Sequence, residues 1–141
     1  MARAFELAMT ADDLSAFFVE AFPGDPQRNF TFARFEPGFL RIEMIPDESM
    51  LRPGDLVSGP TQMALADRAA YAVILAHIGP VAMAVTSNLN MSFLRGVQKA
   101  PVFADARLLK LGRTLASVDV RLWQGVEDHI VAQSTVTYAI P

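Results

Sequence analysis

One stretch of the chain decides the fold: Ser58-Gly-Pro-Thr-Gln-Met-Ala-Leu-Ala-Asp67-Arg-Ala-Ala-Tyr-Ala-Val-Ile-Leu-Ala-His-Ile-Gly79-Pro80. Ser58 or Gly59 can serve as the N-cap of a helix, and Pro60 suits the first turn because the amide hydrogen that it lacks would have no partner there. The Gly79-Pro80 pair ends the pattern, so a helix is predicted over residues 59–78. This helix is apolar almost all round, and such a helix must be enclosed by other elements.

Asp67 is the exception within this helix. On a 3.6-residue period it shares a face with apolar and aromatic residues, namely Met63, Ala64, Ala70, Tyr71 and Ile74. Removing a carboxylate from water without partners costs roughly several kcal/mol, so a buried acid at this position must either have partners that stabilise it or serve a function. Two interpretations fit. Asp67 is either a structural acid, satisfied by hydrogen bonds or paired with Arg68, or a functional acid in unusual surroundings.

The flanking segments predict one further helix and an antiparallel sheet. Thr10 and Asp13 form a capping-box pattern before apolar residues at helical spacing, which predicts a short helix over about 11–22. Six segments follow a strand pattern: 30–35, 39–45, 81–94, 102–111, 114–123 and 129–138. The predicted fold class is therefore α+β, with a sheet of about five to six strands that curls around the long central helix.

Composition limits the classes of function. A chain of 141 residues is expected to form a single domain over 1–141. The hydrophobic content of 52% and the mean hydropathy of +0.27 are high for a monomer, so an oligomer is expected. The net charge of -3 argues against a nucleic-acid partner. The absence of cysteine excludes disulfides, thiolate nucleophiles and cysteine-bound zinc.

The sequence also bears on location and metals. Residues 1–7 lack the uninterrupted apolar stretch of a secretory signal, which favours the cytoplasm. No membrane span is expected over the apolar residues 63–85, because charged and helix-breaking residues interrupt them. His77 and His129 lie far apart without acid-rich spacing around them, so no metal site is predicted.

Three motifs support a more specific interpretation. They are Pro53-Gly-Asp-Leu-Val-Ser-Gly-Pro60, Leu65-Ala-Asp67 and Val85-Thr-Ser-Asn-Leu-Asn-Met-Ser-Phe-Leu-Arg95. In their spacing and order they resemble the hotdog-fold thioesterases, in particular the phenylacetate-pathway-like acyl-CoA thioesterases, over residues 30–138. That family has a loop ending in His-Gly-Gly, a Leu-Ala-Asp in the central helix and a strand ending in Phe-Leu-Arg. The resemblance implies a hotdog fold and hydrolysis of small to medium acyl or aryl-acyl thioesters of CoA.

The resemblance also implies residue roles and an assembly. Asp67 corresponds to the nucleophile or general base of the family, the Gly59 amide to the oxyanion donor, and Thr86 to a hydroxyl that positions water. The implied assembly is a homodimer whose two sheets join edge to edge, or a tetramer built from two such dimers. Acyl-CoA would bind at the subunit boundary, with the CoA moiety as part of the substrate, and no metal or organic cofactor is implied.

Six further residues are candidates for substrate binding: Arg52, Ser58, Pro60, Asn88, Arg95 and Arg113. The first three stand where the family commonly has Asn, His and the second loop glycine, so the chain departs from the family pattern there. In a regularly alternating strand Asn88 shares a face with Thr86, and that polar face either lines a pocket or meets water. The two arginines near strand ends are expected to meet the phosphates of CoA or to be solvated.

The spacing of Gly59 and Asp67 has a geometric consequence of its own. Eight residues at about 1.5 Å of rise each place them about 12 Å apart along one helix, whereas both must act within about 3 Å of the same carbonyl group. One helix cannot do both. If the two residues serve the same thioester, they come from different subunits whose central helices run antiparallel.

Two other functions remain open on the same scaffold. Ser58 and Arg52, in place of the usual polar residues, are also compatible with a non-catalytic module that binds acyl-CoA or an acyl carrier. A hotdog dehydratase or hydratase is the third interpretation, but that chemistry usually pairs a His with the acid. No His lies in the loop or in the early part of the helix.

Overall fold

Helix α2 (Gly59–Ile78) is the central element of the molecule, as predicted. The computed structural model describes residues 5–25 and 27–141, so residues 1–4, on which part of the expectation about a secretory signal rests, lie outside the described residues. Ser58 caps the helix, with its Oγ accepting the Thr61 N–H at 3.2 Å. Gly79 ends it with a φ of 93°, a conformation that glycine adopts without strain.

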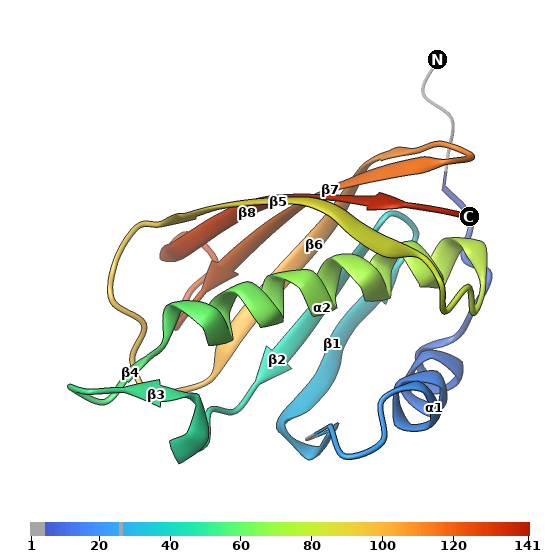
Figure 1. Cartoon of the computed structure of the whole chain (residues 1–141). Helices are drawn as coiled ribbons and strands as arrows, with labels where there is room; N and C mark the ends of the chain where they lie inside the picture. The colour runs from blue at the N-terminus through green and yellow to red at the C-terminus, as the bar shows by residue number, and fades with distance from the viewer. Residues whose placement is uncertain (1–4, 26) are drawn as a thin grey trace.

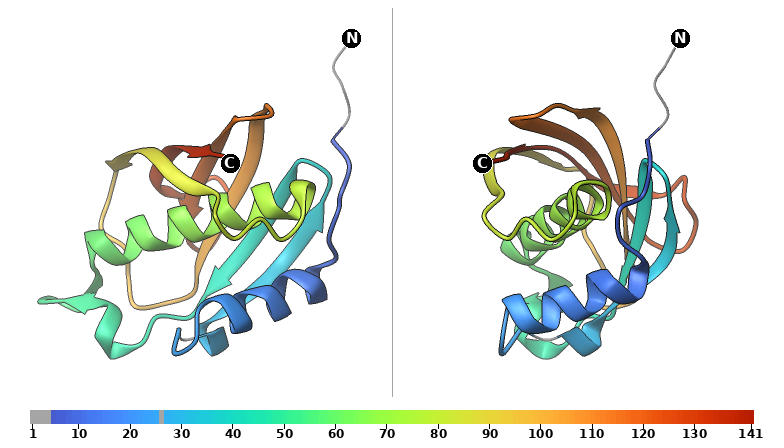
Figure 2. Two further views of the ribbon diagram at one scale, coloured as in Figure 1. Left: turned by 45° about the vertical axis from the view of Figure 1, so that its right-hand side comes forward. Right: turned by 90° about the vertical axis from the view of Figure 1, so that its right-hand side faces the viewer.

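A six-stranded sheet curls around α2 (Figures 1 and 2). The strand order is β1-β2-β6-β7-β8-β5 and every neighbouring pair is antiparallel. The strands are β1 (Phe30–Glu36), β2 (Phe39–Met44), β5 (Val85–Phe93), β6 (Val102–Leu111), β7 (Leu115–Trp123) and β8 (Ile130–Ala139). The predicted α+β class and hotdog fold are confirmed. Strand β5 lies at one edge and pairs with β8 alone within the described chain.

The sheet and α2 share one hydrophobic core. Alternate side chains of β2, namely Leu40, Ile42 and Met44, are buried against the helix, and all residues of α2 from 69 to 77 are buried. Burial of each large apolar side chain contributes roughly 1.5–3 kcal/mol. The right-hand view of Figure 2 shows the sheet curving over one side of α2. The buried side chains of the sheet and of α1 cover its apolar residues, which explains why a helix without a broad polar face is stable here.

Helix α1 (Ala11–Ala21) packs beside α2 rather than on the sheet (Figure 1). The predicted capping box is present: the Asp13 N–H donates to Thr10 Oγ1 and the Thr10 N–H donates to the Asp13 carboxylate, both at 3.0 Å. The buried Leu14 and Phe18 attach the helix, and the Phe18 ring meets the edge of Tyr71 of α2 at 5.8 Å. An aromatic contact therefore links α1 to the helix that carries Asp67.

Two segments differ from the predicted elements. The segment from 81 to 84 is a turn and not the start of a strand, because its amides bond locally, with the Ala84 N–H donating to the Val81 carbonyl at 3.1 Å. The loop between β2 and α2 contains a small ribbon, β3 (Leu51–Arg52) with β4 (Leu56–Val57). The Val57 N–H donates to the Val97 carbonyl at 2.8 Å, which anchors the start of α2 to the segment after β5.

His77 joins the other end of α2 to the sheet. Its Nε2 accepts the Gly38 N–H at 2.8 Å, and its Nδ1 lies 2.7 Å from the Val73 carbonyl. Both contacts are satisfied by a neutral ring with its hydrogen on Nδ1. Burial lowers the pKa of His77, which favours this neutral form. His77 thus connects the end of α2 to the turn between β1 and β2.

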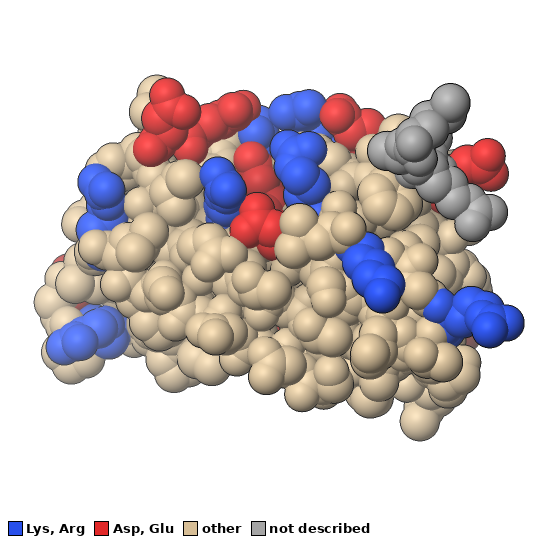
Figure 3. All heavy atoms as spheres, turned by 90° about the horizontal axis from the view of Figure 1, so that it is seen from above, with Lys and Arg blue, Asp and Glu red and all other residues tan. Residues whose placement is uncertain are grey.

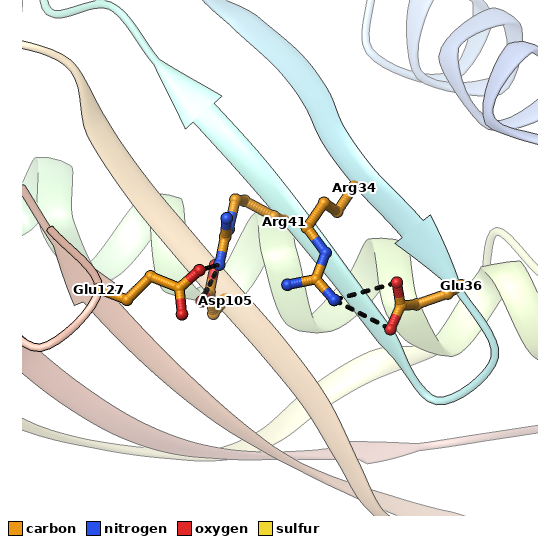
Figure 4. Close-up of polar contacts among 5 residues, drawn as sticks. All are labelled: Arg34, Glu36, Arg41, Asp105 and Glu127. Atoms are coloured by element: carbon orange, nitrogen blue, oxygen red, sulfur yellow. Dashed lines mark hydrogen bonds and ion pairs between the residues drawn. The ribbon is translucent and has the colours of Figure 1, made fainter.

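The outer face of the sheet carries ion pairs beside aromatic rings, including Phe103 stacked on Trp123. Arg41 of β2 donates to Asp105 of β6 at 2.7 Å and to Glu127 at 2.7 Å, and Arg34 pairs with Glu36 (Figure 4). Charged side chains gather along one side of the face seen in Figure 3, and few lie on the other side. Across residues 5–25 and 27–141, no helix is both long and apolar enough to cross a membrane.

Candidate active site

Asp67 lies half-buried in the middle of α2, and its carboxylate is held by two hydroxyls. Its Oδ1 accepts hydrogen bonds from Thr86 Oγ1 and from the Tyr138 hydroxyl, each at 2.7 Å. Within the described chain no residue donates to its Oδ2. The alternative in which Asp67 pairs with Arg68 is wrong, because the Arg68 guanidinium pairs with Asp25 at 2.5 Å.

A bulge in β5 brings Thr86 to the acid. The pairing with β8 shifts between Thr86 and Asn88: Thr86 lies opposite Tyr138, whereas Asn88 lies opposite Thr137. Directly paired residues of antiparallel strands point to the same side of the sheet, so Thr86 faces α2 and Asn88 faces outward. The prediction that these two residues share a face is therefore wrong. Regular alternation cannot account for the extra residue, Ser87.

Tyr138 is the site residue that the sequence did not reveal. It lies on the inner face of β8, is 4% exposed, and stacks on the Tyr71 ring at a centroid distance of 5.6 Å. Burial is the main cause that raises the pKa of its hydroxyl. The hydrogen bond to Asp67 acts in the same direction and the Thr86 hydroxyl acts against it, so this group remains a hydrogen donor. Alternation along 129–138 places Tyr138 on the core side, where an aromatic residue is usually read as packing alone.

A cavity of about 610 Å³ opens beside Asp67. Most of its wall is apolar and comes from α1 and the residue after it, the sheet, the turn before β3, and α2: Phe18, Phe22, Phe30, Met44, Met50 and Tyr71. Its polar lining includes Asp67, Thr86 and the Tyr138 hydroxyl. The size and the mixed lining are those of a small-molecule site, with an apolar wall to bind a hydrocarbon group and a few polar groups to act on one bond.

Arg68 fixes α1 and the following loop as part of this wall. Besides Asp25, its guanidinium donates to Gln27 Oε1 at 2.7 Å. It also lies over the Phe30 ring at 4.0 Å and the Phe18 ring at 4.6 Å. Cation–π contacts of this kind stabilise by about 0.5–2 kcal/mol each. Arg68, which follows Asp67 in the sequence, therefore holds the wall of the cavity in place.

The start of α2 presents one free amide. Pro60 has no N–H, the Thr61 N–H donates to Ser58 Oγ, and the Gln62 N–H donates to the Ser58 carbonyl at 3.1 Å. In the described chain the Gly59 N–H has no such acceptor, as expected for the first residue of a helix. The helix dipole adds partial positive charge there. The two departures from the family pattern, Ser58 and Pro60, thus leave Gly59 as the donor at this terminus.

The remaining candidates lie outside the cavity. Arg52 is exposed on β3 and donates to the Pro53 carbonyl at 3.1 Å, and Arg95 is exposed after β5. Both lie toward the end of the molecule at which α2 begins. Arg113 lies in the turn between β6 and β7, and the pairing of Val85 with Ala139 and of Ala139 with Leu115 places that turn at the opposite end. Neither these three arginines nor Asn88 contacts Asp67 within one subunit.

A curled sheet around a helix, with a hydroxyl-bound carboxylate in a largely apolar cavity, is an arrangement that can hydrolyse a thioester or an ester. The model of the thioesterase superfamily matches residues 54–136, which include α2, the acid and most of β5 to β8. The chain therefore belongs to the thioesterase superfamily.

Individual proteins resemble the chain over most of its length. A candidate thioesterase from Silicibacter sp. TM1040 has a crystal structure with a TM-score of 0.88 and 44% identity, over 97% of this chain and 95% of that one. A candidate esterase from Thermoplasma acidophilum is 28% identical, over 79% of this chain and 83% of its own length. A Streptococcus mutans protein bound to acetyl CoA shares the fold with a TM-score of 0.69 and 23% identity, over 80% of this chain and 89% of that one.

Proposed function

We propose that this hydrolase is an acyl-CoA thioesterase whose active site is formed by two copies of the chain. The observation that carries the proposal is Asp67: its carboxylate lies in the wall of a largely apolar cavity, with one oxygen bound by two hydroxyls and the other without a donor from the described chain. The cavity suits small to medium acyl or aryl-acyl groups. The Streptococcus mutans relative binds acetyl CoA, which supports a CoA thioester as the substrate.

The chemistry uses groups of the chain alone. A water oxygen adds to the thioester carbonyl carbon while the Asp67 carboxylate takes one water proton, and the carbonyl oxygen becomes an oxyanion. The Gly59 N–H of the second copy donates to that oxyanion. As the carbonyl re-forms, the carbon–sulfur bond breaks, and the proton on Asp67 goes to the leaving thiolate. The products are a carboxylic acid and the free CoA thiol, and no cofactor is needed.

Two features favour a second copy over a monomeric site. Gly59 and Asp67 of one chain are about 12 Å apart along α2, too far to serve one carbonyl. The molecule also leaves apolar surface uncovered: Met63, one turn before the acid, is 41% exposed, and Phe93 and Leu94 at the end of β5, near Gly59, are 51% and 55% exposed. The unpaired edge of β5, which carries no charged side chain between Val85 and Phe93, suits pairing with the same strand of another copy.

CoA recognition is assigned to the surface outside the cavity. In the proposed dimer the Gly59 end of one α2 faces the middle of the other, so Arg52 and Arg95 at that end border the same seam. We infer that these two arginines meet the phosphates of CoA. Ser58 and Pro60 act at the substrate carbonyl through the Gly59 amide that they leave free. Asn88 and Arg113 remain predictions as binding residues.

A panel of short, medium and aromatic acyl-CoAs tests the proposal, with free-thiol release as the readout. The parent is expected to release thiol, and Asp67→Asn, which keeps the shape of the side chain, is expected to lose at least about 10³-fold in kcat. Circular dichroism and size-exclusion chromatography check that fold and assembly are kept. Full turnover by Asp67→Asn would refute the assignment, and tight binding by the parent without thiol release would favour a non-catalytic acyl-CoA module.

A further inference from the structure

The hydrogen bonds of Asp67 are distributed unequally between its two oxygens. Thr86 from β5 and Tyr138 from β8 both donate to Oδ1, although they reach it from neighbouring strands. Because the Thr86 proton is already committed to the carboxylate, its hydroxyl cannot at the same time donate to a water molecule. In this structure Thr86 therefore acts on the acid itself.

We propose that Tyr138 is a positioning residue that, together with Thr86, engages Oδ1 of Asp67 and so leaves Oδ2 as the oxygen that takes the proton of the hydrolytic water. This inference rests on the thioesterase function proposed for Asp67. It assigns a role to a residue outside all three motifs of the chain, since Tyr138 lies 71 residues after Asp67 and follows the last motif by more than one strand.

The surroundings of Tyr138 hold its hydroxyl in place. Its ring stacks on Tyr71 at an interplanar angle of 29°, and Tyr71 is itself fixed by donating to the Ala82 carbonyl at 3.0 Å. The Phe18 and Phe22 rings of α1 then pack on Tyr71 at 5.8 Å and 6.0 Å. A rigid donor of this kind holds the carboxylate in one orientation without reorganisation during turnover.

The charged groups around the acid leave this contact undisturbed. Asp25 and Arg68 line the same cavity, but they pair with each other, and Tyr71 is the other titratable group nearby. The contacts to Asp67 from β5 and β8 come from the hydroxyls of Thr86 and Tyr138. Because burial raises the pKa of Tyr138, this hydroxyl keeps its proton through the neutral range in which the carboxylate has to act.

Tyr138→Phe tests the inference, because it removes the hydroxyl and keeps the ring. Loss of a donor disfavours the charged form of the carboxylate, so the acidic limb of the pH profile of kcat/KM is expected to move to higher pH. The water-accepting oxygen is also less well placed, so kcat is expected to fall about tenfold while KM stays within about twofold. Loss of a purely structural contact would not move the acidic limb.

Ser134→Ala is the matched control. Ser134 is fully buried on the same face of β8 and donates to the Asn90 carbonyl at 2.9 Å, so this change also deletes one hydroxyl between β8 and β5. It is expected to leave the acidic limb where it is in the parent. Site-specific 3-fluorotyrosine at position 138 keeps ring and hydroxyl, and as a stronger donor it is expected to move the limb to lower pH even if Tyr138→Phe does not fold.

The possible outcomes distinguish the role of Tyr138 from the thioesterase function on which it depends. If Asp67→Asn has lost turnover and the pH profiles of Tyr138→Phe and of the fluorotyrosine protein superimpose on the parent, the role of Tyr138 is overturned and the thioesterase function stands. If Asp67→Asn retains turnover, both are overturned. Opposite displacements of the acidic limb in the two Tyr138 proteins, with the Ser134→Ala profile unchanged, support the assignment.

Discussion

Gly59→Pro, compared with Gly59→Ala, is the sharpest test that the structure offers, because both variants add a Cβ and only the first deletes the N–H. Proline at the first position of a helix is favourable, and Ser58 before it already has φ of -67° and ψ of 155°, the extended conformation that a following proline requires. The lost amide has no acceptor in the described chain, and a Cβ at this position lies 3.6 Å from the Phe93 ring, an ordinary contact. Because residue 59 precedes Pro60, a Cβ there disfavours the helical conformation, and Gly59→Pro and Gly59→Ala share this cost. We therefore expect the free energies of unfolding of these two variants to differ by less than about 0.5 kcal/mol.

The expected effect on catalysis is much larger. Removal of one oxyanion donor costs about 10²–10³ in kcat, or roughly 2.7–4 kcal/mol of transition-state stabilisation. Gly59→Ala is the control, because it adds the same Cβ and keeps the N–H. Thiol release under saturating acyl-CoA gives kcat, and urea unfolding gives stability. If Gly59→Pro and Gly59→Ala have the same kcat and unfold alike, the Gly59 amide does not stabilise the oxyanion.

Two further predictions concern the cavity and the His77 contact. Phe22→Ala shortens the α1 wall of the cavity and is expected to raise the kcat/KM ratio of decanoyl-CoA over hexanoyl-CoA about tenfold; an unchanged ratio would show that α1 does not limit the acyl group. Because burial lowers the pKa of His77 in the folded protein, the unfolded chain binds the proton more readily. The stability contributed by His77 is thus complete above about pH 6.5 and is lost as pH falls through the folded pKa, with a slope of at most about 1.4 kcal/mol per unit. Urea unfolding between pH 7.5 and 5 should show this slope in the parent and a flatter one in His77→Gln, and equal slopes would contradict the assignment.

The elements with strong local signals could be predicted from the sequence. Ser58, Pro60 and Gly79 mark the ends of α2 through chemistry that acts within a few residues, so its bounds agree with the structure. The same holds for the capping box of α1 and for most strands. The strand prediction is wrong over 81–84, because the apolar residues Val-Ala-Met-Ala are compatible with a strand, whereas the backbone hydrogen bonds there are local.

The site was predictable only where its residues carry a motif or a helical position. Asp67 and Thr86 do, and the structure joins them by a hydrogen bond. Tyr138 does not, because its partner is 71 residues away and the register that brings them together belongs to the sheet as a whole. Asp25, likewise, reaches Arg68 only after α1 has packed beside α2. Long-range partners such as these depend on tertiary structure, and a local pattern does not encode them.

The proposal that two chains share one active site is tested most directly by mixing two defective chains. Asp67→Asn and Gly59→Pro are each expected to abolish turnover in a homodimer. In a heterodimer purified through two different tags, one site combines both defects and the other combines the intact Asp67 of one chain with the intact Gly59 of its partner. The account predicts that such heterodimers regain about half of the parent turnover per dimer. Heterodimers as inactive as the two homodimers would contradict it.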